Sequence, residues 1–132
     1  MSKFDKFNCI EKWKDIIING DITNLDALIH ENATFNSPIV YSPQIGKKIV
    51  VQYLSAAVKI FKNKNFKYTN TLSKDNCTFA EFEAKFDSIV VNGIDLIIIK
   101  NNLIYEFKVF LRPLKGINVV WNEMKKSLRN TQ

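Results

Sequence analysis

The chain has 132 residues, enough to bury one substantial core and too few for two independent ones, so we expect a single domain spanning residues 1–132. Hydrophobic residues make up 46% of the chain and include ten phenylalanines, which argues against disorder and predicts an aromatic-rich core. The net charge of +6 comes largely from scattered lysines, which is typical of a solvated surface and argues against a nucleic-acid partner.

The sequence gives no sign of a membrane span, a secretion signal or a metal site. No apolar run reaches the roughly 18 residues that a membrane-spanning helix needs. The polar start of the chain lacks the apolar segment of a signal peptide, so we expect a soluble, cytoplasmic protein. Cys9, Cys77 and the single histidine have no metal-ligand spacing, and there is no glycine-rich phosphate loop, so no metal and no cofactor are expected.

Capping signatures indicate two helices near the start of the chain. Ser2 and Asp5 resemble a capping box, and apolar residues at helical spacing follow, which predicts a first helix that ends near Gly20. The signature recurs at Thr23 and predicts a short second helix. We expect a short strand at 33–36 to follow it.

Prolines interrupt the chain in the next segment. Pro38 and Pro43 disfavour helix at and before their positions, so residues 37–46 are predicted to form a loop that could be the rim of a site. Beyond the loop, apolar residues fall on one face of the segment 47–61, which predicts a third and longer amphipathic helix.

From residue 66 onward the hydrophobic period changes from helical to two. Alternation over 66–72 and 77–86 predicts two paired antiparallel strands. A long apolar strand over 89–99 and, after a two-residue turn, a strand over 103–112 continue the meander. Helical spacing over 117–128 predicts a closing helix. The whole order is that of an α+β protein in which a curved antiparallel sheet wraps around helices.

Asp95 is the most informative residue for function, because it lies inside the most apolar stretch of the chain. A lone carboxylate is costly to bury unless it is paired, so its pKa is predicted to rise, and a carboxyl poised near neutrality is how enclosed pockets carry out proton chemistry. Strand alternation predicts that Val91, Gly93, Ile97 and Ile99 share its inward face.

Taken together, short sequence phrases resemble SnoaL-like proteins of the nuclear transport factor 2-like (NTF2-like) superfamily. The phrases that carry the resemblance are Trp13, Gly20-Asp21, Leu25, Leu28, residues 33–40, Gly46, Tyr53-Leu54, residues 93–96 and residues 109–114. The resemblance implies a cone-shaped α+β barrel with a curved antiparallel sheet, three N-terminal helices, a C-terminal helix and an enclosed apolar cavity. It also implies a homodimer formed through the outer face of the sheet.

The superfamily includes ketosteroid isomerases, polyketide cyclases, limonene epoxide hydrolase-like enzymes and non-catalytic binding modules. Asp95 resembles the cavity carboxyl that donates a hydrogen bond to an oxyanion in the isomerases. However, Ser37 stands before Pro38 where those isomerases have a general-base aspartate, and Trp13 stands near the place of their first-helix tyrosine. The epoxide-hydrolase arrangement needs an arginine in the cavity, and Arg112 is predicted to point the other way.

Two hypotheses about function follow. In the first, the protein takes a hydrophobic, carbonyl-bearing or cyclic small molecule into its cavity, with Asp95 as the catalytic proton donor or weak base. The ligand-binding candidates are Trp13, Ser37, Tyr41, Tyr53, Tyr68, Phe82, Ile97, Phe107 and Val109. In the second, it is a non-catalytic dimeric module whose cavity is filled by its own aromatic residues. The sequence does not decide whether the protein is an enzyme.

Each candidate also has a structural interpretation. Asp95 could be a structural carboxylate that accepts hydrogen bonds from Asn92, a tyrosine hydroxyl or a lysine. The aromatic candidates could be ordinary core residues. His30 is expected near the end of the second helix, where an imidazolium would suit the helix dipole. Glu81 is expected on the surface or in a dimer interface, and Arg112 could anchor the closing helix or a carboxylate in that interface.

Overall fold

The computed structural model describes the backbone of residues 3–130 and the side chains of residues 9–129. Its elements in chain order are α1 (Lys3–Asn19), a 3-10 helix η1 (Asp26–Leu28), β1 (Ile29–Asn36), β2 (Gln44–Ile45), α2 (Lys47–Phe61), β3 (Lys67–Lys74), β4 (Cys77–Phe86), β5 (Ile89–Lys100), β6 (Leu103–Arg112) and α3 (Leu114–Asn130). The predicted capping role of Ser2 lies outside the described residues.

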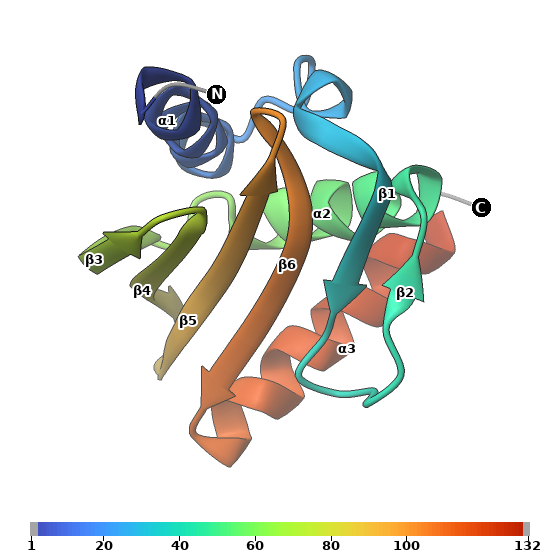
Figure 1. Cartoon of the computed structure of the whole chain (residues 1–132). Helices are drawn as coiled ribbons and strands as arrows, with labels where there is room; N and C mark the ends of the chain where they lie inside the picture. Colours follow the sequence, from blue (N-terminus) through green and yellow to red (C-terminus); the bar gives the residue numbers. More distant parts are fainter. Residues whose placement is uncertain (1–2, 131–132) are drawn as a thin grey trace.

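The strands form one six-stranded sheet in the order β2-β1-β6-β5-β4-β3. Every pairing is antiparallel except that of β1 with β6, which is parallel. Figure 1 shows the curved sheet with α2 and α3 behind it and α1 at one end of the molecule. The predicted α+β fold with a curved sheet and a C-terminal helix is confirmed, although the sheet is open, with β2 and β3 at its edges, and does not close into a barrel.

The β-hairpin turns follow directly from the sequence. Asn101 and Asn102, predicted as a two-residue turn, have φ values of 55° and 62°. Asparagine tolerates this left-handed conformation, which a tight turn between twisted strands requires. Asp75 and Asp87 adopt positive φ in the two preceding turns for the same reason. These turns fix the register of the four-stranded meander from β3 to β6.

The predicted short second helix is present only as one turn of 3-10 helix, and its expected extension to His30 is wrong, because the chain enters β1 at Ile29. Ile29 pairs in register with Ile104 of β6, and this long-range pairing overrides the local helical signature. His30 therefore lies in a strand and not at a helix end. Its ring meets the edge of Tyr105, with ring centroids 5.0 Å apart, and its Nδ1 accepts a hydrogen bond from the backbone of Asn32.

The core lies between the inner face of the sheet and the helices. On β4, alternate residues from Ala80 to Phe86 are buried, as the sequence pattern predicted. On α2, Val50, Leu54, Val58 and Phe61 form the buried face. No helix among residues 3–130 is long and apolar enough to cross a membrane.

Gly93 is the point where β5 packs most closely against its surroundings. A Cβ atom added there would overlap the Phe82 ring and would lie 2.5 Å from the backbone oxygen of Phe110. The carbonyl belongs to the adjacent strand β6 and cannot move without disturbing the sheet. A side chain at position 93 is therefore excluded by β6 as well as by the core.

We predict that Gly93→Ala lowers the free energy of unfolding by about 1–3 kcal/mol, the usual cost of overpacking a core. Chemical denaturation measures this loss. Gly116→Ala is the matched control, because its added Cβ would meet a methyl group of Val91 at 3.2 Å and alanine favours the helix around it. Equal stability of the Gly93 variant and the wild type would contradict the prediction.

Candidate functional site

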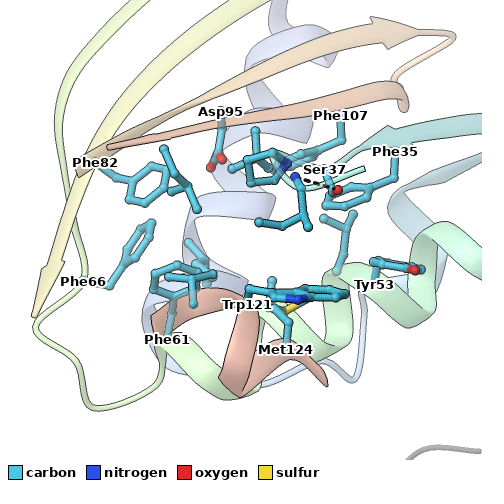
Figure 2. A pocket seen from close by; sticks show the side chains of 18 of the residues that line it. Phe35, Ser37, Tyr53, Phe61, Phe66, Phe82, Asp95, Phe107, Trp121 and Met124 are labelled. Carbon is cyan, nitrogen blue, oxygen red and sulfur yellow. Dashed lines mark hydrogen bonds between the residues drawn. The ribbon is translucent and has the colours of Figure 1, made fainter. Parts of the chain in front are cut away.

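An apolar cavity of about 60 Å³ lies between the sheet and the three α-helices. Figure 2 shows Asp95 and Phe107 on one side of it and Trp121 and Met124 on the other. The space admits a few water molecules. It is small beside ordinary ligand pockets, which range from about 300 to 1,000 Å³. The aromatic side chains fill much of the interior without closing it completely.

Strand β5 places Asp95 in the cavity wall. Val91, Gly93, Ile97 and Ile99 share its buried face, which confirms the predicted alternation. Asp95 is only 5% exposed, and it is the one charged residue among those described that line the cavity. Burial raises its pKa from 3.8 to about 7, against the opposing effect of a hydrogen bond from Tyr68. The carboxyl is therefore poised to change charge near neutral pH.

A short chain of hydrogen bonds ends at this carboxyl. The indole Nε1 of Trp13 donates to the hydroxyl of Tyr68 over 2.8 Å, and that hydroxyl donates to Asp95 Oδ2 over 2.6 Å. Burial is the largest cause that raises the pKa of Tyr68 well above its ordinary value, and the nearby Asp95 raises it further. Tyr68 is thus a neutral donor to Asp95 at physiological pH.

Ser37 lies in the cavity wall, but its hydroxyl stabilises the adjacent loop. Its Oγ accepts hydrogen bonds from the backbone amides of Ile39 at 3.1 Å and Val40 at 3.0 Å. These bonds shape the start of the loop between β1 and β2, as serine hydroxyls commonly do in turns. A hydroxyl used in this way does not replace a carboxylate base.

The structure brings most of the predicted site residues together. Besides Asp95, those that line the cavity are Trp13, Ser37, Tyr53, Phe82, Phe107 and Val109. Tyr68 is not part of the lining and reaches the site through its bond to Asp95. Ile97 faces inward one alternation step beyond Asp95 and is buried in the core outside the cavity.

Tyr41 lies apart from the cavity and is fully exposed. It belongs to the proline-flanked loop, where it lines an external groove together with Lys108 and Phe110. The sequence indicated correctly that a loop begins at residue 37 beside the site, since Ser37 and Pro38 line both the cavity and the groove. The predicted loop over 37–46 is wrong at its end, because Gln44 and Ile45 pair with β1 as the short strand β2. It could not show which loop side chains turn inward.

Sequence reasoning missed the contribution of the last helix. Val120, Trp121 and Met124 of α3 line the cavity, and Figure 2 shows Trp121 and Met124 across from Asp95. Their spacing on one helical face was a usable signal, because an amphipathic helix turns that face toward the core. No group of histidine, cysteine or acidic side chains suited to a metal ion occurs in the described part of the chain.

No protein-family model matches the sequence, and no curated protein matches it either. The structure, however, is similar to solved structures. A steroid delta-isomerase from Pseudomonas aeruginosa is 26% identical, with a TM-score of 0.89 over 96% of this chain and 93% of that one. An uncharacterized protein with a cystatin-like fold from Silicibacter pomeroyi is 25% identical, with a TM-score of 0.81 over 89% and 83%.

A third similar structure, an NTF2-like protein of unknown function from Mesorhizobium loti, is 17% identical, with a TM-score of 0.75 over 83% of this chain and 92% of that one. The neighbours are thus NTF2-like and ketosteroid isomerase-like proteins. The chain therefore has the fold of NTF2-like proteins, in agreement with the fold that the SnoaL-like resemblance of its sequence implies.

The position of Asp95 predicts that stability depends on pH. Between about pH 4 and pH 7 the folded protein retains a proton on Asp95 that the unfolded chain has lost. Stability should therefore fall as the pH rises through this range and level off above it. Relative to Asp95→Asn, we expect the free energy of unfolding of the wild type to decrease by roughly 4 kcal/mol, since one pKa unit corresponds to about 1.4 kcal/mol.

Chemical denaturation of both proteins between pH 4 and pH 8.5 measures this difference. Asparagine can still accept the hydrogen bond from Tyr68, so the variant mainly removes the titration. Asp87→Asn, in an exposed turn, controls for the change in net charge. A stability difference between Asp95→Asn and the wild type that stays constant with pH would rule out the buried titration.

Proposed function

We propose that this protein binds a small, mainly apolar molecule with one acceptor oxygen, such as a ketone, and that neutral Asp95 donates a hydrogen bond to that oxygen. The observation that carries the proposal is the position of Asp95 in an otherwise uncharged cavity. Its Oδ2 is held by Tyr68, whereas Oδ1 has no hydrogen-bond partner among the described residues. The similarity to a steroid delta-isomerase supports a carbonyl-bearing ligand.

The chemistry available to this site is that of a weak acid. With a pKa of about 7, Asp95 can give or take a proton at physiological pH. Its hydrogen bond would polarise a carbonyl and stabilise negative charge on the oxygen, because the surroundings are apolar. Isomerase-like, cyclase-like or hydrolase-like turnover would also need a base, and Ser37 is not one. The proposal therefore centres on binding, with Asp95 as an acid catalyst if the ligand reacts.

The cavity also limits the size of the ligand. About 60 Å³ is too little for a steroid, so a larger ligand would have to displace side chains of α3. Trp121 and Met124 are the wall opposite Asp95, and they determine how far a ligand bonded to Asp95 can extend. A single ring with one oxygen is thus the appropriate first probe.

We predict that cyclohexanone binds about fivefold more tightly than methylenecyclohexane at pH 5.5, since a net hydrogen bond contributes about 1 kcal/mol. The two molecules match in shape and differ in the acceptor oxygen. Affinity for the ketone should fall as the pH rises through about 7, because Asp95 then loses the proton that it donates. Titrations followed by NMR chemical shifts measure both affinities.

Two variants sharpen this test. Asp95→Asn keeps an N–H donor facing the ligand, so it should retain the preference for the ketone and lose its pH dependence. Asp95→Leu should lose the preference altogether. Failure of both probes to bind the wild type would instead favour the non-catalytic module with a filled cavity.

We also propose that two copies of the chain associate through the outer face of the sheet. Phe79, Ile94 and Phe110, on β4, β5 and β6, are exposed on this face, and Ile94 is paired with Phe110 in register. Beside them, Arg112 points away from the cavity, as predicted, and donates to Asn92 Oδ1 over 3.3 Å. An apolar patch bordered by polar groups is typical of an interface.

This association predicts that Ile94→Glu is monomeric where the wild type is dimeric, because the patch would have to bury an unpaired charge. Size-exclusion chromatography with light scattering measures the mass. Ile18→Glu, an exposed position on α1, is the control and should remain dimeric. A monomeric wild type at about 100 µM, a concentration at which a stable dimer forms readily, would contradict the proposal.

A further inference from the structure

We propose that Trp13 and Tyr68 are positioning residues that fix the acidic proton of Asp95 on Oδ1, the oxygen left free for a ligand. The two residues are joined to Asp95 by the hydrogen bonds of 2.8 Å and 2.6 Å described above. The consequence for a ligand rests on the proposed function. The direction of the hydrogen bonds does not, and it can be tested in the free protein.

The direction follows from the chemistry of the donors. An indole N–H can only donate, so the oxygen of Tyr68 must accept from Trp13. The single hydroxyl hydrogen of Tyr68 is then available for Asp95 Oδ2. A proton on Oδ2 that pointed toward Tyr68 would place two hydrogens in one 2.6 Å contact. Neutral Asp95 is therefore left with its proton on Oδ1, where it can be donated into the cavity.

Packing holds each member of the chain in place. Trp13 is 2% exposed, and its ring meets that of Phe107 edge-on, with centroids 5.1 Å apart. The ring of Tyr68 lies edge-on against Phe66, with centroids 5.0 Å apart. Trp13, Tyr68 and Asp95 belong to α1, β3 and β5, so three separate elements set one donor direction. Tyr68 does not line the cavity, and it acts through Asp95.

Few other titratable groups face this chain. Lys14 of α1 lies over the Tyr68 ring, 5.8 Å from its centroid, donates to Thr71 of β3 and forms an ion pair with Glu11. Tyr53 of α2 lines the cavity. The side chains that β4, β6 and α3 contribute to the lining are uncharged. The resonances of the residues hydrogen-bonded to Asp95 should therefore shift in a single step as Asp95 titrates.

This arrangement makes the Trp13 indole a reporter of Asp95, although its hydrogen bond goes to Tyr68 and not to Asp95 itself. When Asp95 ionises, the hydroxyl of Tyr68 is drawn more strongly toward Oδ2, and its oxygen becomes a better acceptor for Trp13, since linked hydrogen bonds strengthen one another. The indole proton resonance of Trp13 should therefore move downfield as the pH rises through the Asp95 midpoint. A merely structural tryptophan would show no such dependence on Tyr68.

The first experiment follows the indole N–H resonances of ¹⁵N-labelled protein from pH 5 to pH 9. The chain has two tryptophans, so the indole signal that remains in Trp121→Phe belongs to Trp13. In the wild type we expect one titration step for Trp13, and in Tyr68→Phe and Asp95→Asn we expect its amplitude to fall at least threefold. An unchanged amplitude in Tyr68→Phe would overturn the proposal. If Tyr68→Phe does not fold, the chain is tested with Trp13→Phe in the ketone-binding experiment below, because that variant has no Trp13 resonance to follow.

The second experiment measures ketone and hydrocarbon binding in the same variants. Tyr68→Phe should raise the pH midpoint of ketone binding, because the carboxylate loses a hydrogen bond that stabilises it. Tyr68→Phe and Trp13→Phe should both lower the ketone preference at least twofold at pH 5.5, since the proton is no longer confined to Oδ1. A structural defect would weaken both ligands alike and leave the midpoint unchanged, which would overturn the proposal.

The two experiments separate failure of this inference from failure of the proposed function. If no ketone binds but the Trp13 resonance titrates through Tyr68, the positioning chain stands and the proposed ligand class is wrong. If the wild type prefers the ketone but Tyr68→Phe keeps the same preference and midpoint, the proposed function stands and the positioning role of Tyr68 is wrong.

Discussion

The hydrogen bond from Tyr68 to Asp95 spans the inner face of the sheet and depends on much of the structure around it. Tyr68 lies on the edge strand β3 and Asp95 on β5, with β4 between them. The β4 residue paired with Asp95 is Ala80, whose small side chain leaves the inner face open at that point. Close packing at Gly93 keeps β5 near the rings of the core. The bond is therefore a consequence of strand order and register as much as of two side chains.

The nature of the partners of Asp95 weighs against a purely structural role. A carboxylate that serves only the fold is normally paired with a cation or with several donors, and its pKa then falls. Asp95 has one neutral donor and no cation in the described lining, and its pKa rises to about 7. The folded protein thus bears the cost of an isolated buried acid. Such a cost is characteristic of functional sites, where burial shifts the pKa into the working range.

Local patterns predicted the parts of the site that depend on one strand or one helix. The inward face of β5 followed from alternation, and the bounds of α2 matched the predicted helix over 47–61. A tyrosine hydroxyl was one of the expected partners of Asp95, but which tyrosine supplies it did not follow, because Tyr68 meets Asp95 only through the register of three strands. Parallel pairing of β1 with β6 was likewise invisible, since alternation is the same in both orientations. The wall formed by α3 did not follow either, because it depends on how the whole helix packs against the rest of the protein.

The sheet and the last helix contribute different groups to the site. Asp95, held by Tyr68, supplies the polar group, whereas Trp121 and Met124 supply an apolar wall across the cavity. Substitutions in α3 can therefore change the size of the cavity without altering the acid on its opposite wall. Conversely, Asp95→Asn replaces the acid with an amide of nearly the same size and shape. Ser37 is hydrogen-bonded within its own turn. The acid–base chemistry that this site offers therefore comes from one weak acid, Asp95, which Tyr68 orients.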